Sequence, residues 1–129
     1  MSKTKDQRPP VAVGHVFLPV KNVPATSAFL QEIGLRPVFE NEKKTFSVLE
    51  LRGGTHVIVE KSRKRIKKGD QAPVDLMVDD VKKARAKYAK MGLKPTRIKT
   101  GSVHSSFFIP GPDGWAYKIT SSHATGLPV

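Results

Sequence analysis

The chain has 129 residues, of which 38% are apolar and 26% are charged, a balance typical of one globular domain rather than of a disordered or fibrous chain. It contains no cysteine, which excludes disulfides, thiolate metal sites and a cysteine nucleophile. The formal net charge is +12. No apolar stretch has the length of a signal-peptide core or a membrane span, so we expect a basic cytoplasmic protein that does not bind membranes.

The first half of the chain predicts a strand, a helix and three more strands. Residues 11–20 form a β-rich apolar run that should be the opening strand. A helix is expected over residues 24–33, with Pro24 near its start and Gly34 as the residue that ends it. The next three strands are expected at residues 36–40, 45–51 and 55–60, with turns at 41–44 and 52–54.

The second half predicts the same order of elements. After a strand at residues 73–78, a helix is expected over residues 81–91, because apolar side chains recur there at helical spacing. Asp79 and Asp80 suit the positive end of the helix dipole, and Gly92 is a natural helix stop. Three strands should follow at residues 94–98, 104–109 and 115–120, with a Pro-Gly-Pro-Asp-Gly turn at 110–114 before the last.

The two halves are related by an offset of 58 residues. Such an internal repeat indicates a duplicated structural unit. We therefore predict an α+β fold made of two tandem βαβββ modules, at about residues 11–60 and 73–122 of a single domain that spans 11–122. Residues 1–10 are expected to be a disordered tail and residues 123–129 a second tail. The matching pairs are Val20 and Val78, Val23 and Val81, Ala28 and Ala86, Gly34 and Gly92, Leu35 and Leu93, and Pro37 and Pro95.

Residues 61–72 join the modules as a basic linker with six basic side chains and the single acid Asp70. Such a run resembles a patch for nucleic acid or another polyanion. It contains no aromatic side chain to stack on bases and no readout motif. We favour a solvated loop, with nucleic-acid binding that is only non-specific.

The chain resembles the glyoxalase/bleomycin-resistance/dioxygenase (vicinal oxygen chelate) superfamily. The resemblance is carried by the repeat and by three local sequences, at residues 13–20, at 34–37 with the matching 92–95, and at 107–114. The resemblance covers about residues 11–122. It implies curved mixed sheets that enclose a cavity and, in the metal enzymes of the family, metal ligands on the first and fourth strands of each module. The four matching positions are His15, Ile58, Pro73 and Lys118. One usual ligand of four is not a metal site, so we expect no metal and no other cofactor.

Several residues are candidates for the cavity, with alternatives left open. His15 either lines the cavity or is a structural histidine. Glu60 lies on the same strand face as Ile58 and is either a weak surrogate metal ligand or a solvated carboxylate. Lys118 should meet Asp75, an anionic ligand or solvent, because an unpaired buried cation is costly.

His104 and Phe108 share one face of the strand expected at 104–109 and complete the candidate ligand-binding residues. Whether that face lines the cavity stays open. His56 lies on the same strand face as Ile58, but neither it nor His123 has a partner at metal-ligand spacing in the sequence.

The leading interpretation is a small-molecule-binding protein of the bleomycin-resistance kind with a metal-free cavity, and the positive net charge favours an anionic ligand. The resemblance implies a homodimer. One alternative is a metal-dependent lyase, isomerase or dioxygenase with a displaced site that uses His15, Glu60 and either His104 or His56. Another is a nucleic-acid-associated protein acting through the basic linker. Catalysis, the ligand and the pairing of modules within or between chains stay open.

Overall fold

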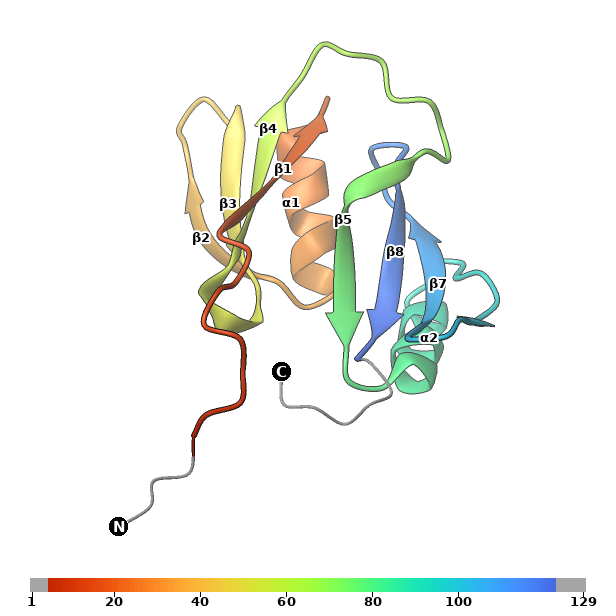
Figure 1. The fold of residues 1–129 in the computed structure, drawn as a ribbon. Helices are drawn as coiled ribbons and strands as arrows, with labels where there is room; N and C mark the ends of the chain where they lie inside the picture. Colours follow the sequence, from red (N-terminus) through yellow and green to blue (C-terminus); the bar gives the residue numbers. More distant parts are fainter. Residues whose placement is uncertain (1–4, 123–129) are drawn as a thin grey trace.

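The computed structural model describes residues 5–122, and every structural statement below concerns that range. The described chain forms two four-stranded sheets and two α-helices, with the basic linker passing over one end of the molecule (Figure 1). Residues 1–4 of the first predicted tail and the whole second tail, with His123, lie outside the described residues. No helix in the described range is long and apolar enough to cross a membrane.

The first module has the predicted order strand, helix and three strands. Its elements are β1 (His15–Val20), α1 (Val23–Glu32), β2 (Arg36–Glu40), β3 (Phe46–Glu50) and β4 (His56–Lys61), with a short 3-10 turn at Arg52–Gly54. The strands lie in the order β1-β4-β3-β2. β1 is parallel to β4 because α1 carries the chain back across the sheet, whereas the other pairs are antiparallel.

The second module repeats this topology. Its elements are β5 (Gln71–Val78), α2 (Val81–Lys90), β6 (Lys99–Thr100), β7 (Ser105–Pro110) and β8 (Ala116–Ser121). The strand order is β5-β8-β7-β6, again with one parallel pair, β5 and β8. The prediction of two tandem βαβββ modules in an α+β fold is confirmed.

The helix boundaries repeat at the predicted offset of 58 residues. Asn22 and Asp80 cap the two helices, and each side chain accepts a backbone N–H three residues later, at 3.0 Å in both cases. Both helices end before a glycine with a positive φ, +124° at Gly34 and +81° at Gly92, which is a conformation that other residues rarely adopt.

Two strand predictions need correction. The first strand begins at His15 and not at residue 11, because its partner β4 begins at His56, directly opposite. The strand expected at 94–98 is absent, and the two-residue β6 replaces it. Pro95 does not account for this difference, because its counterpart Pro37 lies inside β2. Lys94, unlike its counterpart Arg36, has a positive φ of +54°, and the Thr96 hydroxyl accepts the Phe108 N–H at 2.9 Å.

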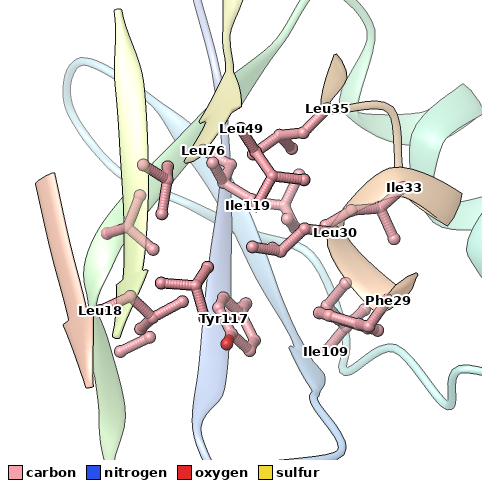
Figure 2. Close-up of a cluster of buried hydrophobic side chains, with 14 of the residues drawn as sticks. Leu18, Phe29, Leu30, Ile33, Leu35, Leu49, Leu76, Ile109, Tyr117 and Ile119 are labelled. Atoms are coloured by element: carbon pink, nitrogen blue, oxygen red, sulfur yellow. The ribbon is translucent and has the colours of Figure 1, made fainter. Parts of the chain in front are cut away.

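One hydrophobic core joins the two modules. Figure 2 shows side chains of α1, such as Leu30, facing side chains from both sheets, including Leu49 and Ile119. The ring of Phe29 on α1 lies 5.2 Å from the ring of Tyr117 on β8. α1 therefore packs against the second module as well as its own. In each sheet, the face that points away from this core is called the open face below.

A cluster around Asp113 ties the turn at residues 110–114 to the first module. The Asp113 carboxylate accepts hydrogen bonds from the hydroxyls of Thr26 on α1 (3.0 Å) and Tyr117 on β8, and from the Trp115 N–H (2.8 Å). The Trp115 indole donates to the Pro19 carbonyl at 2.9 Å. These four residues, with Asp113, form the Asp113 cluster.

Burial and electrostatics act together on the tyrosines of this core. Burial, followed by the charge and the hydrogen bond of Asp113, raises the pKa of Tyr117 well above its usual range. Burial also raises the pKa of Tyr88, whose hydroxyl donates to the Ile33 carbonyl at 3.3 Å. On the surface between the modules, the Arg52 guanidinium hydrogen-bonds to Asp79 at 2.9 Å and lowers the pKa of that carboxyl.

Candidate functional site

The open face of the first sheet carries aromatic side chains that solvent reaches. On β1 and β4, every second residue is buried in the core, so the residues between them point to the open face. Phe17, Phe39 and Phe46 are exposed to 57%, 52% and 36% of their surface. Exposed apolar side chains gathered on one face are typical of surfaces that bind another molecule.

A hollow of about 510 Å³ lies on this open face. It sits where the beginning of β3, the end of β4 and the start of the basic linker meet. Its volume falls within the range of roughly 300–1,000 Å³ found for sites that bind small molecules. The residues that line it are Thr45, Phe46, Ile58, Glu60, Lys61 and Arg63, all from the first module and the linker.

Strand pairing places the apolar and polar walls of this hollow. Phe46 pairs with Glu60 across β3 and β4, and Ile58 stands two residues before Glu60 on the same face. The Phe39 ring lies 5.5 Å from the Phe46 ring and extends the apolar wall. The result is an apolar floor bounded by the Glu60 carboxylate and by two cations, Lys61 at the end of β4 and Arg63 just after it.

Three charged side chains line the hollow without an ion pair. Among the described residues, Glu60, Lys61 and Arg63 have no oppositely charged atom within 4.0 Å and make no side-chain hydrogen bond to protein. Glu60 is half-buried, whereas Lys61 and Arg63 are exposed. Their hydrogen-bonding groups are therefore free for water or for a ligand.

A polar row crosses the other end of the same open face. Strand register places Arg36, Glu50, His56 and His15 side by side on the four strands. Arg36 donates to Glu50 at 2.7 Å, His56 Nε2 lies 3.8 Å from the second oxygen of Glu50, and the His15 and His56 rings stack with centroids 5.6 Å apart. Sequence reasoning found no partner for His56, because the register of β1 against β4 is a tertiary feature.

The residues at the four family metal positions do not fit a metal. Ile58 stands opposite Phe17, and Lys118 stands opposite Asp75, which places both at equivalent points of their modules. Neither isoleucine nor proline offers a side-chain donor, and a lysine ammonium repels a cation. Of these positions only His15 is a usual ligand, and no group of three His, Asp or Glu suited to a metal occurs in residues 5–122.

A displaced metal site built on His15 and Glu60 is not supported either. His15 pairs with His56, and Glu60 lies four residues further along β4, which corresponds to about 13 Å along a strand. Two side chains so far apart do not share one ion at bond lengths of about 2 Å. His104 belongs to the other module, where it directly precedes β7 and its Nδ1 lies 2.7 Å from the Ser121 carbonyl oxygen.

The remaining candidates lie on the second sheet, apart from the hollow. Lys118 on β8 is half-buried and lies between Asp75 on β5 and Phe108 on β7 in the strand register. It forms no ion pair with Asp75 within 4.0 Å in the described structure, and the Asp75 carboxylate instead accepts a hydrogen bond from the Thr120 hydroxyl. Of the alternatives for Lys118, contact with a ligand or with solvent therefore stays open.

Of the candidates named from sequence, Glu60 alone lines the hollow. The structure adds Thr45, Phe46, Lys61 and Arg63, none of which was singled out for the cavity. The signal for Phe46 was present, since it alternates with Val48 on a strand that pairs with β4. No local signal placed Lys61 and Arg63, because the linker was expected to be a solvated loop.

Comparisons with known proteins identify the fold. No family model matches the sequence, and no curated protein matches it. A crystal structure of lactoylglutathione lyase from Agrobacterium tumefaciens is similar, with a TM-score of 0.73 at 16% identity, over 92% of this chain and 99% of that one. The oxidase ChaP-H2 has a TM-score of 0.69 at 18% identity, over 91% of this chain and 98% of that one.

A possible glyoxalase from Bacillus cereus has a TM-score of 0.67 at 18% identity, over 84% of this chain and 96% of that one. These structures confirm at the level of the fold the resemblance that the repeat and the local sequences indicated. The chain therefore has the same fold as these glyoxalase and oxidase structures. Sequence identities of 16–18% support a shared fold only, and proteins with one fold have many different functions.

Proposed function

We propose that this protein binds a small organic molecule, without a metal ion, in the hollow on the open face of its first module. The observation that carries the proposal is the hollow itself, about 510 Å³ in volume, with an apolar floor of Phe46 and Ile58. Small-molecule sites combine apolar surface with polar groups that orient the ligand, and this hollow combines its two apolar side chains with Thr45, Glu60, Lys61 and Arg63. The family resemblance suggested a binder of the bleomycin-resistance kind, and the hollow supports the small-molecule-binding part of that interpretation.

The polar groups of the hollow support binding rather than metal chemistry. Glu60, Lys61 and Arg63 are the charged groups at its wall, and none of them is engaged with another charged group of the described chain. Unengaged charges beside an apolar floor give a ligand both orientation and specificity. Three of the four family metal positions carry Ile58, Pro73 and Lys118, so no step of this proposal is assigned to a metal.

A nuclear magnetic resonance titration tests the proposal. The amide spectrum of the ¹⁵N-labelled chain is recorded with a panel of bicyclic aromatic acids, alcohols and amines. At least one compound should shift the amides of Thr45, Phe46 and residues 58–63 in a saturable manner. A panel without a binder, or shifts confined to the second sheet around Lys118, would overturn the proposal.

The expected homodimer is part of the same proposal. Phe17 on β1 and Met77 on β5 are exposed to 57% and 45% of their surface, and a second copy of the chain would remove them from water. Light scattering at several protein concentrations should give the mass of a dimer. The mass of one chain at all concentrations would restrict the site to residues of a single copy.

A further inference from the structure

We infer that the ligand of this hollow is an organic anion with a flat apolar face and a hydrogen-bond donor at a separate position. The inference rests on the proposed function and adds the chemical class of the ligand. Three parts of the hollow carry it: the apolar floor, the pair of cations at the start of the linker, and the carboxylate of Glu60.

The floor selects a flat apolar face. Phe46 and Ile58 face the hollow, and the Phe39 ring continues the surface 5.5 Å from the Phe46 ring. A planar partner stacks on the Phe46 ring and covers Ile58, while the Phe39 ring, tilted by 38° to that of Phe46, contacts its edge. An aromatic ring system meets this requirement at a small cost in conformational entropy, because it has few rotatable bonds.

The cations at the linker start are held in place beside this floor. The Lys61 N–H donates to the Thr45 carbonyl at 2.8 Å, and the Ser62 N–H donates to the Val20 carbonyl at 2.8 Å. The Ser62 hydroxyl accepts the Lys64 N–H at 3.2 Å, which fixes the backbone on both sides of Arg63. Lys61 and Arg63 are thus presented from a backbone that is already ordered.

These two cations favour an anionic group on the ligand. Neither forms an ion pair within 4.0 Å in the described part of the chain. Guanidinium and ammonium groups donate five and three hydrogen bonds and accept none, so their direct partner is an anion or another acceptor. A carboxylate, sulfonate or phosphate ester supplies both the charge and the acceptor oxygens.

Glu60 adds a second requirement. Its carboxylate is half-buried in the hollow, has no partner of opposite charge among the described residues, and accepts but does not donate when ionised. An anion without a donor would meet this carboxylate as a like charge. A hydroxyl or N–H on the ligand, placed away from the anionic group, satisfies Glu60 while the cations hold the anion.

Calorimetric titration of a matched ligand set tests the inference. The probes are 6-hydroxy-2-naphthoate, which has all three features, 2-naphthoate, which lacks the donor, and 2-naphthol, which lacks the anion. We expect the hydroxy acid to bind on the order of tenfold more tightly than either single-feature probe. Its affinity should fall as salt is raised, whereas that of 2-naphthol should not.

Two double variants that remove the same number of positive charges distinguish the effect of the hollow from the effect of the net charge. The double variant Lys61→Gln, Arg63→Gln should weaken both acids on the order of tenfold and leave 2-naphthol unchanged. Its control, Arg65→Gln, Lys67→Gln, removes two charges of the same linker that do not line the hollow, and it should leave all three affinities unchanged. Glu60→Met should strengthen 2-naphthoate and cancel the advantage of the hydroxy acid.

Failure of the inference differs from failure of the proposed function. If 2-naphthol binds in the hollow as tightly as the acids, or if the control variant weakens the acids as much as the linker-start variant, the inferred ligand class is wrong while the hollow remains a binding site. If none of the three probes and no compound of the wider panel shifts residues 45–46 and 58–63, the proposed function itself fails.

Discussion

Removing the Asp113 carboxylate should uncouple the last turn of the second module from the first helix. In Asp113→Ala, the hydroxyls of Thr26 and Tyr117 lose the acceptor that they share. Both residues have 0% of their surface exposed, so water does not replace that acceptor without a rearrangement. The Trp115 N–H loses its bond to the same carboxylate at 2.8 Å.

The magnitude follows from the two buried hydroxyls. A buried donor left without a partner costs about 1–3 kcal/mol, so the two together give about 2–6 kcal/mol. Single substitutions rarely exceed about 4–5 kcal/mol, and local relaxation lowers the sum. We expect Asp113→Ala to lower the free energy of unfolding by about 3 kcal/mol. Asp70→Ala, which removes an exposed carboxylate, should change it by less than about 0.5 kcal/mol.

Urea unfolding followed by circular dichroism measures this difference, and Trp115, the one tryptophan of the chain, reports separately on the turn. A double-mutant cycle with Thr26→Val tests the contact directly, because the two losses should be non-additive by about 1 kcal/mol or more. A destabilisation below about 1 kcal/mol for Asp113→Ala, or strict additivity in the cycle, would refute the role given to this cluster.

Four further predictions concern packing, pH, metals and the linker. Gly111→Ala places a methyl group against the Tyr117 ring and should destabilise by about 1–3 kcal/mol, whereas Gly14→Ala has open space and should be neutral; equal effects would contradict this packing. The pKa of Tyr117 in the folded state is raised above the usual 10.0. The protonated Tyr117 hydroxyl therefore contributes its full stability below pH 10, and this contribution is lost as the pH rises above 10. Tyr117 should contribute a slope of up to about 1.4 kcal/mol per pH unit, and Tyr117→Phe should remove this contribution and leave that of Tyr88, with the phenolate absorbance of Tyr117 appearing only on unfolding. Dialysis against Zn²⁺, Mn²⁺ or Fe²⁺ should leave no stoichiometric metal by elemental analysis, and near-unit occupancy abolished by His15→Ala would overturn that expectation. Duplex DNA should bind weakly and lose affinity steeply with salt, whereas sequence-selective binding at physiological salt would make the linker a specific site.

The fold could be predicted from the sequence because its signals are local and occur twice. Gly34 and Gly92 each follow the end of a helix. In the strands, every second residue is apolar, which predicts the face that is buried. The prediction failed at residues 94–98, where Lys94 is left-handed although its counterpart Arg36 in β2 is not. The repeat suggested a strand, and the backbone conformation at Lys94 interrupts it.

The candidate site was predicted only in part, because its contacts depend on strand register and on the path of the linker. Glu60 was placed correctly on the open face by alternation along β4. The stack of His15 on His56 requires the parallel register of β1 and β4, which no local pattern encodes. Arg63 reaches the hollow because backbone hydrogen bonds hold the linker start against the first sheet.

A crystal structure of the protein with 6-hydroxy-2-naphthoate tests the central claim most directly. We predict that the ring system lies on Phe46 and Ile58, with its carboxylate within hydrogen-bond distance of Lys61 or Arg63 and its hydroxyl toward Glu60. Ligand density on the second sheet between Asp75 and Lys118, or an empty hollow at saturating ligand, would contradict the assignment of this hollow as the binding site.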